Sequence, residues 1–340
     1  MKMELNDLND SLAEHDLSGF WNTRTPEHQD EAPYLWKWRE VYPCLMDARE
    51  SVGLELAERR AIRLVNPQNP TRATSRTLLF TFSVVNPGEI ARPHRHNMAA
   101  IRFVVKGSGA FTLVEGERFP MHEGDLILTP NWTWHEHHNE SSEPIVWLDG
   151  LDGPLINALN VLFFENYEKD TQGVTRADGD AQMRYGFARP PAHAEFPGRG
   201  LPFCYRWEDT DASLHNIVDA EADPFDGHLV RYTNPVTGGY TMATLSCEAQ
   251  MLKPGWVTGT HRHTSTSLYH VFRGRGRTAV GEGFLEWEKG DSFMIPNWQW
   301  HRHENPFDEE AVVFSMNDRP VLEALALYRE EQRPGGNGGR

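Results

Sequence analysis

The sequence has few cysteines and no long hydrophobic run. Its three cysteines, Cys44, Cys204 and Cys247, are far apart in the 340 residues and form no C-x-x-C pair, so neither a disulfide framework nor a zinc ribbon is predicted. No apolar stretch approaches the ~18 residues that a membrane span needs, and the polar start MKMELNDLND lacks the apolar segment of a signal peptide. We therefore expect a cytoplasmic protein.

Positive charge is also scarce. The formal net charge is -16, from 33 Lys and Arg against 49 Asp and Glu, which argues against nucleic acid and anionic membranes as partners. Hydrophobic residues make up 39% of the chain and charged residues 24%, as in an ordinary globular protein. An anionic small molecule would therefore have to be attracted by local positive groups.

The chain contains a long internal repeat. From Pro87 it reads PGEIARPHRH and then KGSGAFTLVEGERFPMHEGDLILTPNWTWHEHHN, and from Pro254 it reads PGWVTGTHRH and then RGRGRTAVGEGFLEWEKGDSFMIPNWQWHRHEN. Within each copy, short segments of alternating polarity are bounded by Gly, Pro, Asn and Asp, which is typical of many short strands. The repeat predicts an all-β fold with two small barrels in tandem.

We expect five segments along the chain, with helices flanking the barrels. These are a helical and extended region over 1–75, a first barrel over 76–165, a connecting segment over 166–227, a second barrel over 228–318, and a C-terminal helix with a flexible tail over 319–340. Helical apolar spacing predicts helices over 3–16 and 45–62.

The histidines of the first copy form a candidate metal site. Alternate side chains of a strand share a face, so His94 and His96 point together, and the returning hairpin supplies His135 from a neighbouring strand. Three neutral imidazoles suit Fe, Zn, Ni or Cu and leave open positions for reactants. The second copy repeats the pattern, either as a working site or as ligands retained without one, at His261, His263 and His301.

The spacing of these residues resembles the two motifs of the cupin superfamily, carried in the first copy by Gly88, His94, His96, Gly107, Gly124, Pro130, His135 and Asn139. The resemblance implies a bicupin, that is, two double-stranded β-helix (jelly-roll) barrels with a metal in the mouth. A typical cupin carries a glutamate where this chain has Ala100 and, in the second copy, Ser267. The fourth protein ligand is therefore missing twice, which leaves room for a bidentate substrate and dioxygen.

Two further residues are expected to face the metal. Continued alternation puts Arg102 on the inward face, where a buried guanidinium needs an anion, either a substrate carboxylate or an internal acid such as Asp149. His137 follows His135 on the same face. It is either a hydrogen-bond donor or base for a substrate, or a solvated rim histidine.

Longer motifs narrow the resemblance. The stretches PHRHNMAAIRFVVKGSG, TPNWTWHEH and WLDGLDGP, with PYLWKW and AERRAIRLVNP upstream, resemble the gentisate 1,2-dioxygenase family of bicupins, which also includes salicylate and 1-hydroxy-2-naphthoate dioxygenases. The resemblance extends from about Pro33 to Arg329. It implies a homo-oligomer, a tetramer in most relatives.

The resemblance also implies the reaction. An Fe(II) enzyme of this family inserts both atoms of O2 across the ring bond between the carboxyl-bearing and hydroxyl-bearing carbons of an aromatic hydroxy acid. One ferrous ion would be held in each N-terminal cupin, on the positions that match His94, His96 and His135. The remaining implied site positions are Arg102 for the carboxylate, His137 for the hydroxyl or oxygen, Trp147 and Asp149 in the pocket, and an upstream arginine at Arg60 or, as its competitor, Arg59.

One departure from the family leaves the substrate open. Relatives that act on gentisate usually carry a small residue and then a glutamine in the strand before the PGE turn, where this chain has Thr81 and Ser83, close to Leu79 and Phe80. Salicylate, a 5-substituted salicylate such as 5-nitrosalicylate, and 1-hydroxy-2-naphthoate are therefore alternatives to gentisate.

Two other classes of bicupin stay in competition. One is a non-catalytic binding or storage protein, in which the metal is structural or absent. The other is a manganese-dependent decarboxylase of the oxalate type, which would be expected to keep the glutamate that Ala100 and Ser267 replace.

Overall fold

The computed structural model describes residues 4–22, 31–57, 59–186, 201–217 and 222–333. The chain divides into two units, Met1–Glu31 and Ala32–Arg340. The first contains helix α1 (Leu5–Ala13), within the helix predicted over 3–16, and a 3-10 turn η1 (Phe20–Asn22). The predicted flexible tail from residue 334 lies outside the described residues. No helix in the described part of the chain has the length and apolarity to cross a membrane.

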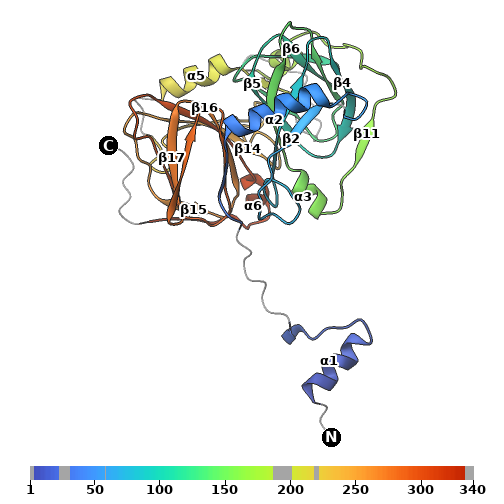
Figure 1. Ribbon diagram of the computed structural model, residues 1–340, viewed down its shortest axis with the longest axis vertical. Helices are drawn as coiled ribbons and strands as arrows, with labels where there is room; N and C mark the ends of the chain where they lie inside the picture. Colours follow the sequence, from blue (N-terminus) through green and yellow to red (C-terminus); the bar gives the residue numbers. More distant parts are fainter. Residues whose placement is uncertain (1–3, 23–30, 58, 187–200, 218–221, 334–340) are drawn as a thin grey trace. The chain divides into compact units, whose positions relative to one another are not determined.

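The second unit contains the two predicted barrels, each built from two antiparallel sheets (Figure 1). The first barrel pairs a six-stranded sheet, in the order β12-β8-β5-β10-β3-β2, with a five-stranded sheet, in the order β11-β4-β9-β6-β7. Its strands are β2 (Arg60–Arg63), β3 (Leu79–Val85), β4 (Ile90–His96), β5 (Ala100–Lys106), β6 (Ala110–Val114), β7 (Glu117–Met121), β8 (Leu126–Thr129), β9 (His135–Asn139), β10 (Ile145–Leu151), β11 (Phe164–Asn166) and β12 (Cys204–Tyr205).

The second barrel repeats this arrangement with sheets β1-β19-β16-β21-β14-β13 and β18-β17-β20-β15-β22. Its strands are β1 (Tyr34–Trp36), β13 (His228–Arg231), β14 (Ser246–Leu252), β15 (His261–His263), β16 (Ser267–Arg273), β17 (Arg275–Val280), β18 (Gly283–Glu288), β19 (Ser292–Ile295), β20 (His301–Glu304), β21 (Ala311–Asn317) and β22 (Glu330–Gln332). The predicted all-β bicupin is confirmed.

The barrels exchange edge strands. Strand β1, from the start of the unit, pairs with β19 of the second barrel, whereas β12, from the connecting segment, pairs with β8 of the first. Each exchanged strand leads into a helix, α2 (Trp38–Ser51) or α5 (Trp207–Asn216). The carboxylates of Asp291 and Asp125 accept the backbone N–H groups of Trp38 (2.8 Å) and Trp207 (2.9 Å), where these helices begin. The predicted segments 1–75 and 166–227 thus supply strands to the barrels.

The helix predicted over 45–62 is wrong at both ends. Helix α2 begins at Trp38 and ends at Ser51, after which Val52 adopts an extended conformation. Residues Arg60–Arg63 form β2, because this stretch pairs with β3 at the edge of the sheet. The short helices α3 (Gly153–Ala158), α4 (Asp180–Tyr185) and α6 (Arg319–Ala324) complete the fold.

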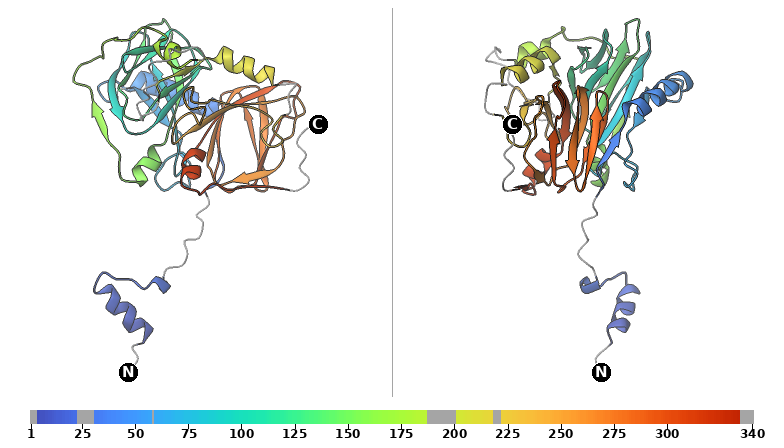
Figure 2. Two further views of the ribbon diagram at one scale, coloured as in Figure 1. Left: turned by 180° about the vertical axis from the view of Figure 1, so that it is seen from behind. Right: turned by 60° about the vertical axis from the view of Figure 1, so that its left-hand side comes forward.

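The two barrels share one hydrophobic core. The barrels lie side by side in the views of Figures 1 and 2, and apolar residues of both belong to a single buried cluster. Phe103 of β5 stacks on Phe314 of β21, with ring centroids 4.4 Å apart. Phe80 and Phe82, on the outward face of β3, are also fully buried in this cluster, and each such side chain contributes about 1.5–3 kcal/mol. The interior faces of the barrels therefore remain available for polar sites.

Candidate metal centre

Three histidines converge inside the first barrel. His94 and His96 lie on β4, and His135 begins β9, where it pairs directly with His94. One ring nitrogen from each lies within 4.8 Å of the other two, and all three residues are buried. The alternation of β4 and the return of the hairpin therefore produce the cluster that the spacing predicted.

The hydrogen bonds of these histidines fix their ring orientation. The Nδ1 atoms of His94, His96 and His135 lie 3.1, 2.9 and 2.9 Å from the backbone oxygens of Arg92, Met98 and Thr133. Because a carbonyl oxygen can only accept, each neutral ring carries its proton on Nδ1 and its lone pair on Nε2. This is the arrangement in which imidazoles bind a metal.

Burial keeps the three imidazoles neutral. It lowers the pKa of His94 to about 2 and the pKa of His96 to about 4, and it holds the pKa of His135 well below the usual value. The Nε2 atom of His135 has no hydrogen-bond partner among the described residues. A buried nitrogen without a partner is costly unless something binds it, so the cluster fits a metal ion.

The cluster of the described residues contains no carboxylate. The position at which cupins carry glutamate is Ala100, at the start of β5, and it is fully buried. Three imidazoles on one side of a metal leave coordination positions on the other.

A charged row crosses the sheet beside the cluster. Arg102 on β5 pairs in register with Asp149 on β10, and Asp149 pairs with Thr81 on β3. Arg102 Nε lies 3.4 Å from Asp149 Oδ1, but neither atom makes a hydrogen bond with the described residues. Burial lowers the pKa of Arg102 to about 10, which still leaves its side chain charged at neutral pH.

A second arginine reaches the same carboxylate. Arg59 Nε donates to Ser83 Oγ (3.3 Å) and lies 3.8 Å from Asp149 Oδ2, and the Ser83 hydroxyl donates to that same oxygen (2.7 Å). Arg102 also donates to the hydroxyl of Thr129. Arg59 and Arg102 thus share one carboxylate, which leaves this buried row with an excess positive charge. An anionic ligand would neutralise it.

His137 and Trp147 present unpaired polar atoms next to this row. His137 Nδ1 lies 3.0 Å from Thr112 Oγ1, while His137 Nε2 and Trp147 Nε1 have no partner among the described residues. Their ring centroids are 4.9 Å apart. His137 is only 1% exposed, so the alternative of a solvated rim histidine is wrong.

Comparisons with known proteins agree with this geometry. The cupin domain family matches residues 81–150 and 249–317. The chain is 43% identical to a 5-aminosalicylate 1,2-dioxygenase of Comamonas sp over 305 residues, which cover 88% of this chain and 81% of that enzyme. It is 40% identical to a 1-hydroxy-2-naphthoate 1,2-dioxygenase of Nocardioides sp. (strain KP7), covering 88% and 78%.

A solved structure agrees over nearly the whole chain. The salicylate 1,2-dioxygenase from Pseudaminobacter salicylatoxidans superimposes with a TM-score of 0.89 at 32% identity, covering 98% of this chain and 99% of that one, and it has also been solved in adducts with gentisate. The chain belongs to the gentisate and salicylate 1,2-dioxygenase family. It is therefore a ring-cleaving dioxygenase.

The structure separates the two candidate arginines of this dioxygenase. Arg60 pairs in register with Val84, on the outward face of the sheet. Its guanidinium forms an ion pair with Glu89, and its Nε donates to the backbone oxygen of Val52 (2.7 Å). The structure therefore does not bring Arg60 to the site, and Arg59, one residue earlier and on the opposite face, takes the place expected for it.

Three of the β3 residues expected near the pocket share one face of the sheet, whereas Phe80 points to the opposite face and into the core. Leu79, Thr81 and Ser83 pair in register with Leu151, Asp149 and Trp147 and share the interior face with them. Thr81 and Ser83 are buried, whereas Leu79 is partly exposed.

Sequence reasoning missed two contributors to this dioxygenase site. Phe164 of β11 stacks on His94, with ring centroids 5.1 Å apart, and no motif pointed to it. Thr112, which holds His137, has a counterpart in Thr278, which lies 2.9 Å from the Nδ1 atom of His303. The alignment of the two repeats could have revealed this pair.

Proposed function

We propose that this chain is an Fe(II)-dependent dioxygenase that splits the C1–C2 ring bond of a monocyclic ortho-hydroxybenzoate, with one ferrous ion in each N-terminal cupin. The observation that carries the proposal is the combination of three neutral imidazoles, His94, His96 and His135, with a buried excess of positive charge beside them. When bound there, iron supplies Lewis acidity and couples the aromatic acid to triplet O2. The residues around it then determine how the acid binds.

The substrate carboxylate would meet the charged row. Arg102 has an Nε–H that finds no hydrogen-bond partner in the part of the chain that the structure describes, and a planar guanidinium suits a carboxylate. Arg59 lies on the same face and shares Asp149 with Arg102. A carboxylate that entered this row would balance its charge, and Asp149 would hold both guanidinium groups in position.

His137 would act on the ortho-hydroxyl group. Its Nδ1 atom lies 3.0 Å from Thr112 Oγ1, and its buried Nε2 atom has no partner within the described ranges, so that nitrogen is free to face a ligand. Burial holds the pKa of His137 well below its usual value, so the ring is neutral. We propose that the neutral His137 ring accepts a hydrogen bond from this hydroxyl group at Nε2, and that Trp147 Nε1 donates a hydrogen bond within the same pocket.

The substrate class follows from β3 and from the relatives. Thr81 and Ser83 place two small polar side chains on the interior face, at positions where gentisate-cleaving relatives usually carry a small residue and a glutamine. The relatives named above act on 5-aminosalicylate and 1-hydroxy-2-naphthoate, and the salicylate enzyme binds gentisate. We propose a salicylate with an electron-donating group at ring position 5, such as gentisate, with salicylate, 5-nitrosalicylate and 1-hydroxy-2-naphthoate as alternatives.

Oxygen uptake by the reconstituted enzyme tests this proposal. Protein loaded anaerobically with Fe(II) is given gentisate, 5-aminosalicylate, salicylate, 5-nitrosalicylate or 1-hydroxy-2-naphthoate, and O2 uptake is measured when air is admitted. We expect one O2 consumed per substrate without release of CO2, fastest with gentisate or 5-aminosalicylate. Release of CO2 without O2 uptake would instead indicate a decarboxylase. Binding of the aromatic acid without turnover would indicate a storage protein.

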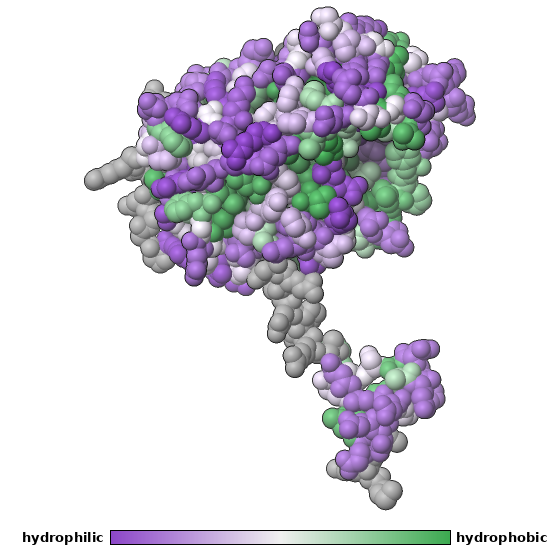
Figure 3. All heavy atoms as spheres, viewed as in Figure 1, coloured by the Kyte–Doolittle hydropathy of each residue, from purple (hydrophilic) through white to green (hydrophobic). Residues whose placement is uncertain are grey.

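We further propose a homotetramer in the cytoplasm. An apolar stretch after α3 is solvent-exposed, with Leu159 at 61% and Phe163 at 63%, and Figure 3 shows green hydrophobic residues near the right-hand margin, where β11 lies. Such a stretch is typical of a subunit interface. The cysteines are not joined in disulfides, which suits a reducing compartment. Sedimentation equilibrium of the purified protein would give the oligomeric state.

A further inference from the structure

A second histidine triad lies inside the other barrel. His261 and His263 on β15 and His301 at the start of β20 place one ring nitrogen each within 4.8 Å of the others. All three are at least nine-tenths buried, and the Nε2 atoms of His261 and His301 have no hydrogen-bond partner among the described residues. Two buried polar nitrogens without partners thus lie at the same point, as expected of residues that bind a metal ion.

The ring orientations in this triad match those of metal ligands. His263 Nδ1 lies 2.8 Å from the backbone oxygen of Ser265, and His301 Nδ1 lies 2.9 Å from that of Gln299. These carbonyls keep the proton on Nδ1 and leave the Nε2 lone pairs for a metal.

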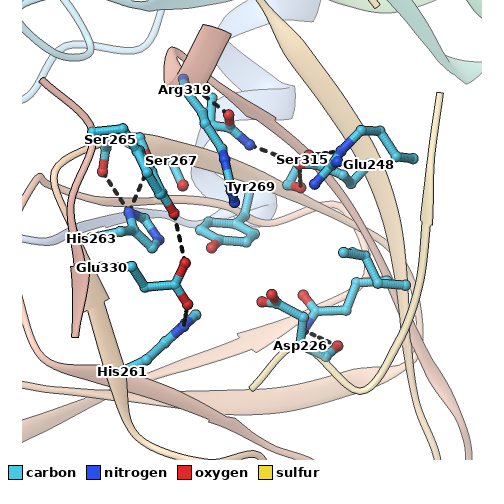
Figure 4. A pocket seen from close by; sticks show the side chains of 15 residues that line it. Asp226, Glu248, His261, His263, Ser265, Ser267, Tyr269, Ser315, Arg319 and Glu330 are labelled. Atoms are coloured by element: carbon cyan, nitrogen blue, oxygen red, sulfur yellow. Dashed lines mark hydrogen bonds and ion pairs between the residues drawn. The ribbon is translucent and has the colours of Figure 1, made fainter. Parts of the chain in front are cut away.

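His261 is oriented by a carboxylate instead. Figure 4 shows Glu330 of β22 pointing at His261, whose Nδ1 atom lies 3.6 Å from Glu330 Oε1, while the Tyr328 hydroxyl donates to Glu330 Oε2 (2.8 Å). In the first barrel the corresponding His94 uses a backbone oxygen. A carboxylate behind a ligating histidine fixes its ring and raises its basicity as a ligand, so Glu330 improves the site for a metal.

The surrounding wall differs from that of the first barrel. The register places Tyr269, Ser315 and Glu248 in the row that Arg102, Asp149 and Thr81 occupy there. The Tyr269 ring stacks on Phe293, with centroids 4.6 Å apart. The excess of positive charge that would bind an aromatic acid is therefore not reproduced.

The cavity is also small. Its volume is about 60 Å³, far below the roughly 300–1,000 Å³ of pockets that bind drug-sized ligands, so it does not suit an aromatic acid. Glu248, on its wall, is already held by Arg231 Nε (3.1 Å) and Asn317 Nδ2 (2.7 Å). Among the described residues of this cavity, the three histidines are the group whose ligand atoms lie within 4.8 Å of one another.

We propose that the C-terminal cupin binds a second divalent transition-metal ion through the Nε2 atoms of His261, His263 and His301, with Glu330 orienting His261, as a structural site in which water completes the coordination. The ion stabilises the second barrel and takes no part in turnover. The triad has no carboxylate ligand, and imidazole donors suit Zn(II), Fe(II) and related ions, so Zn(II) serves as the probe.

Metal counting tests this inference. Protein stripped with a chelator is reloaded with Zn(II), or anaerobically with Fe(II), and the metal bound per chain is measured by mass spectrometry. We expect two ions in the wild type and one in each of His135→Ala and His301→Ala, with O2 uptake by the Fe(II) form lost in the first variant and retained in the second. One ion in the wild type that His301→Ala retains would overturn this inference and leave the proposed function standing. Two ions without any O2 uptake would contradict only the proposed function.

A milder variant addresses the case in which His301→Ala does not fold. Glu330→Gln keeps the shape of the side chain and removes its charge, and we expect Zn(II) affinity at this site to fall by 10- to 100-fold in competition with a chelator. The control is Glu331→Gln, the neighbouring carboxylate of β22, which pairs with Arg262. Equal affinities for both variants would contradict the role of Glu330.

Discussion

Replacing Arg102 with methionine should separate substrate binding from metal binding. The Arg102 side chain is fully buried, and its Nε lies 3.4 Å from an oxygen of Asp149 that makes no hydrogen bond with the described residues. Methionine fills much of the same volume without the charge. The metal cluster makes its own hydrogen bonds to backbone oxygens and should persist.

The magnitude follows from the charge balance of the row. In the wild type, Arg59 and Arg102 share Asp149, so a bound carboxylate brings the row to neutrality. In Arg102→Met, Arg59 alone balances Asp149, and an incoming carboxylate would be buried as excess negative charge. Losing one partner of a buried, hydrogen-bonded charge pair costs about 2–5 kcal/mol. At 1.4 kcal/mol per tenfold, about 3 kcal/mol weakens substrate binding by roughly 100-fold.

Anaerobic calorimetry with gentisate measures this loss directly, and metal content is measured on the same samples. The matched control is Arg95→Met, which removes a guanidinium on the other face of β4, where Arg95 Nε donates to Glu165 (2.8 Å). We expect full metal content in both variants and weakened binding only in Arg102→Met. Unchanged gentisate affinity, or loss of metal, in Arg102→Met would refute the reasoning.

Three further predictions concern other parts of the molecule. Arg59→Met should raise KM for gentisate about tenfold, because it removes roughly 1.4 kcal/mol of substrate binding energy. Arg60→Met should leave KM unchanged and lower the free energy of unfolding in urea by about 1 kcal/mol, because it removes the ion pair with Glu89. The reverse result would show that Arg60, and not Arg59, contacts the substrate. His94→Ala should abolish iron binding and turnover, and His261→Ala should leave turnover largely intact, as metal analysis and oxygen uptake would show; loss of all iron in His261→Ala alone would contradict the assignment. Burial lowers the pKa of His270 to about 3, far below the value near 6.5 in the unfolded chain, so the unfolded chain takes up a proton first as the pH falls. The free energy of unfolding should therefore fall below about pH 6.5, by up to about 1.4 kcal/mol per pH unit from this residue. Urea titrations from pH 7 to pH 4 should show a weaker pH dependence in His270→Gln than in the wild type, and equal slopes would contradict the assignment.

The sequence predicted those parts of the site that depend on alternation within one strand. His94 and His96 share a face of β4 because they are two residues apart, and repetition of the motif located both triads. The inward position of Arg102 was predicted by continuing this alternation from His96, although the residues between β4 and β5 are not in a strand. In such cases the local period of two determines the geometry, and no tertiary information is needed.

The parts that the sequence did not predict depend on pairing between distant segments. Arg59 and Arg60 are adjacent, so composition cannot tell which one faces inward, and the pairing of Ala61 with Ser83 settles it. The apolar spacing over 45–62 continues past the end of α2, and only the edge of the β3 sheet makes Arg60–Arg63 a strand. Phe164 lies over His94 because β11 pairs with β4, which no local pattern encodes.

The exchanged strands make the folding of each barrel depend on the other barrel. The backbone N–H of Trp38 donates to Asp291, which lies 253 positions further along the chain. This hydrogen bond can form only after the second barrel has been synthesised. Contacts of such long range slow folding. The amino-terminal barrel, cut out alone, would lose β12 and uncover Phe80, Phe82 and Phe103. We expect a chain that lacks the second barrel to aggregate through these exposed phenyl rings, so that both barrels are needed for either one to fold.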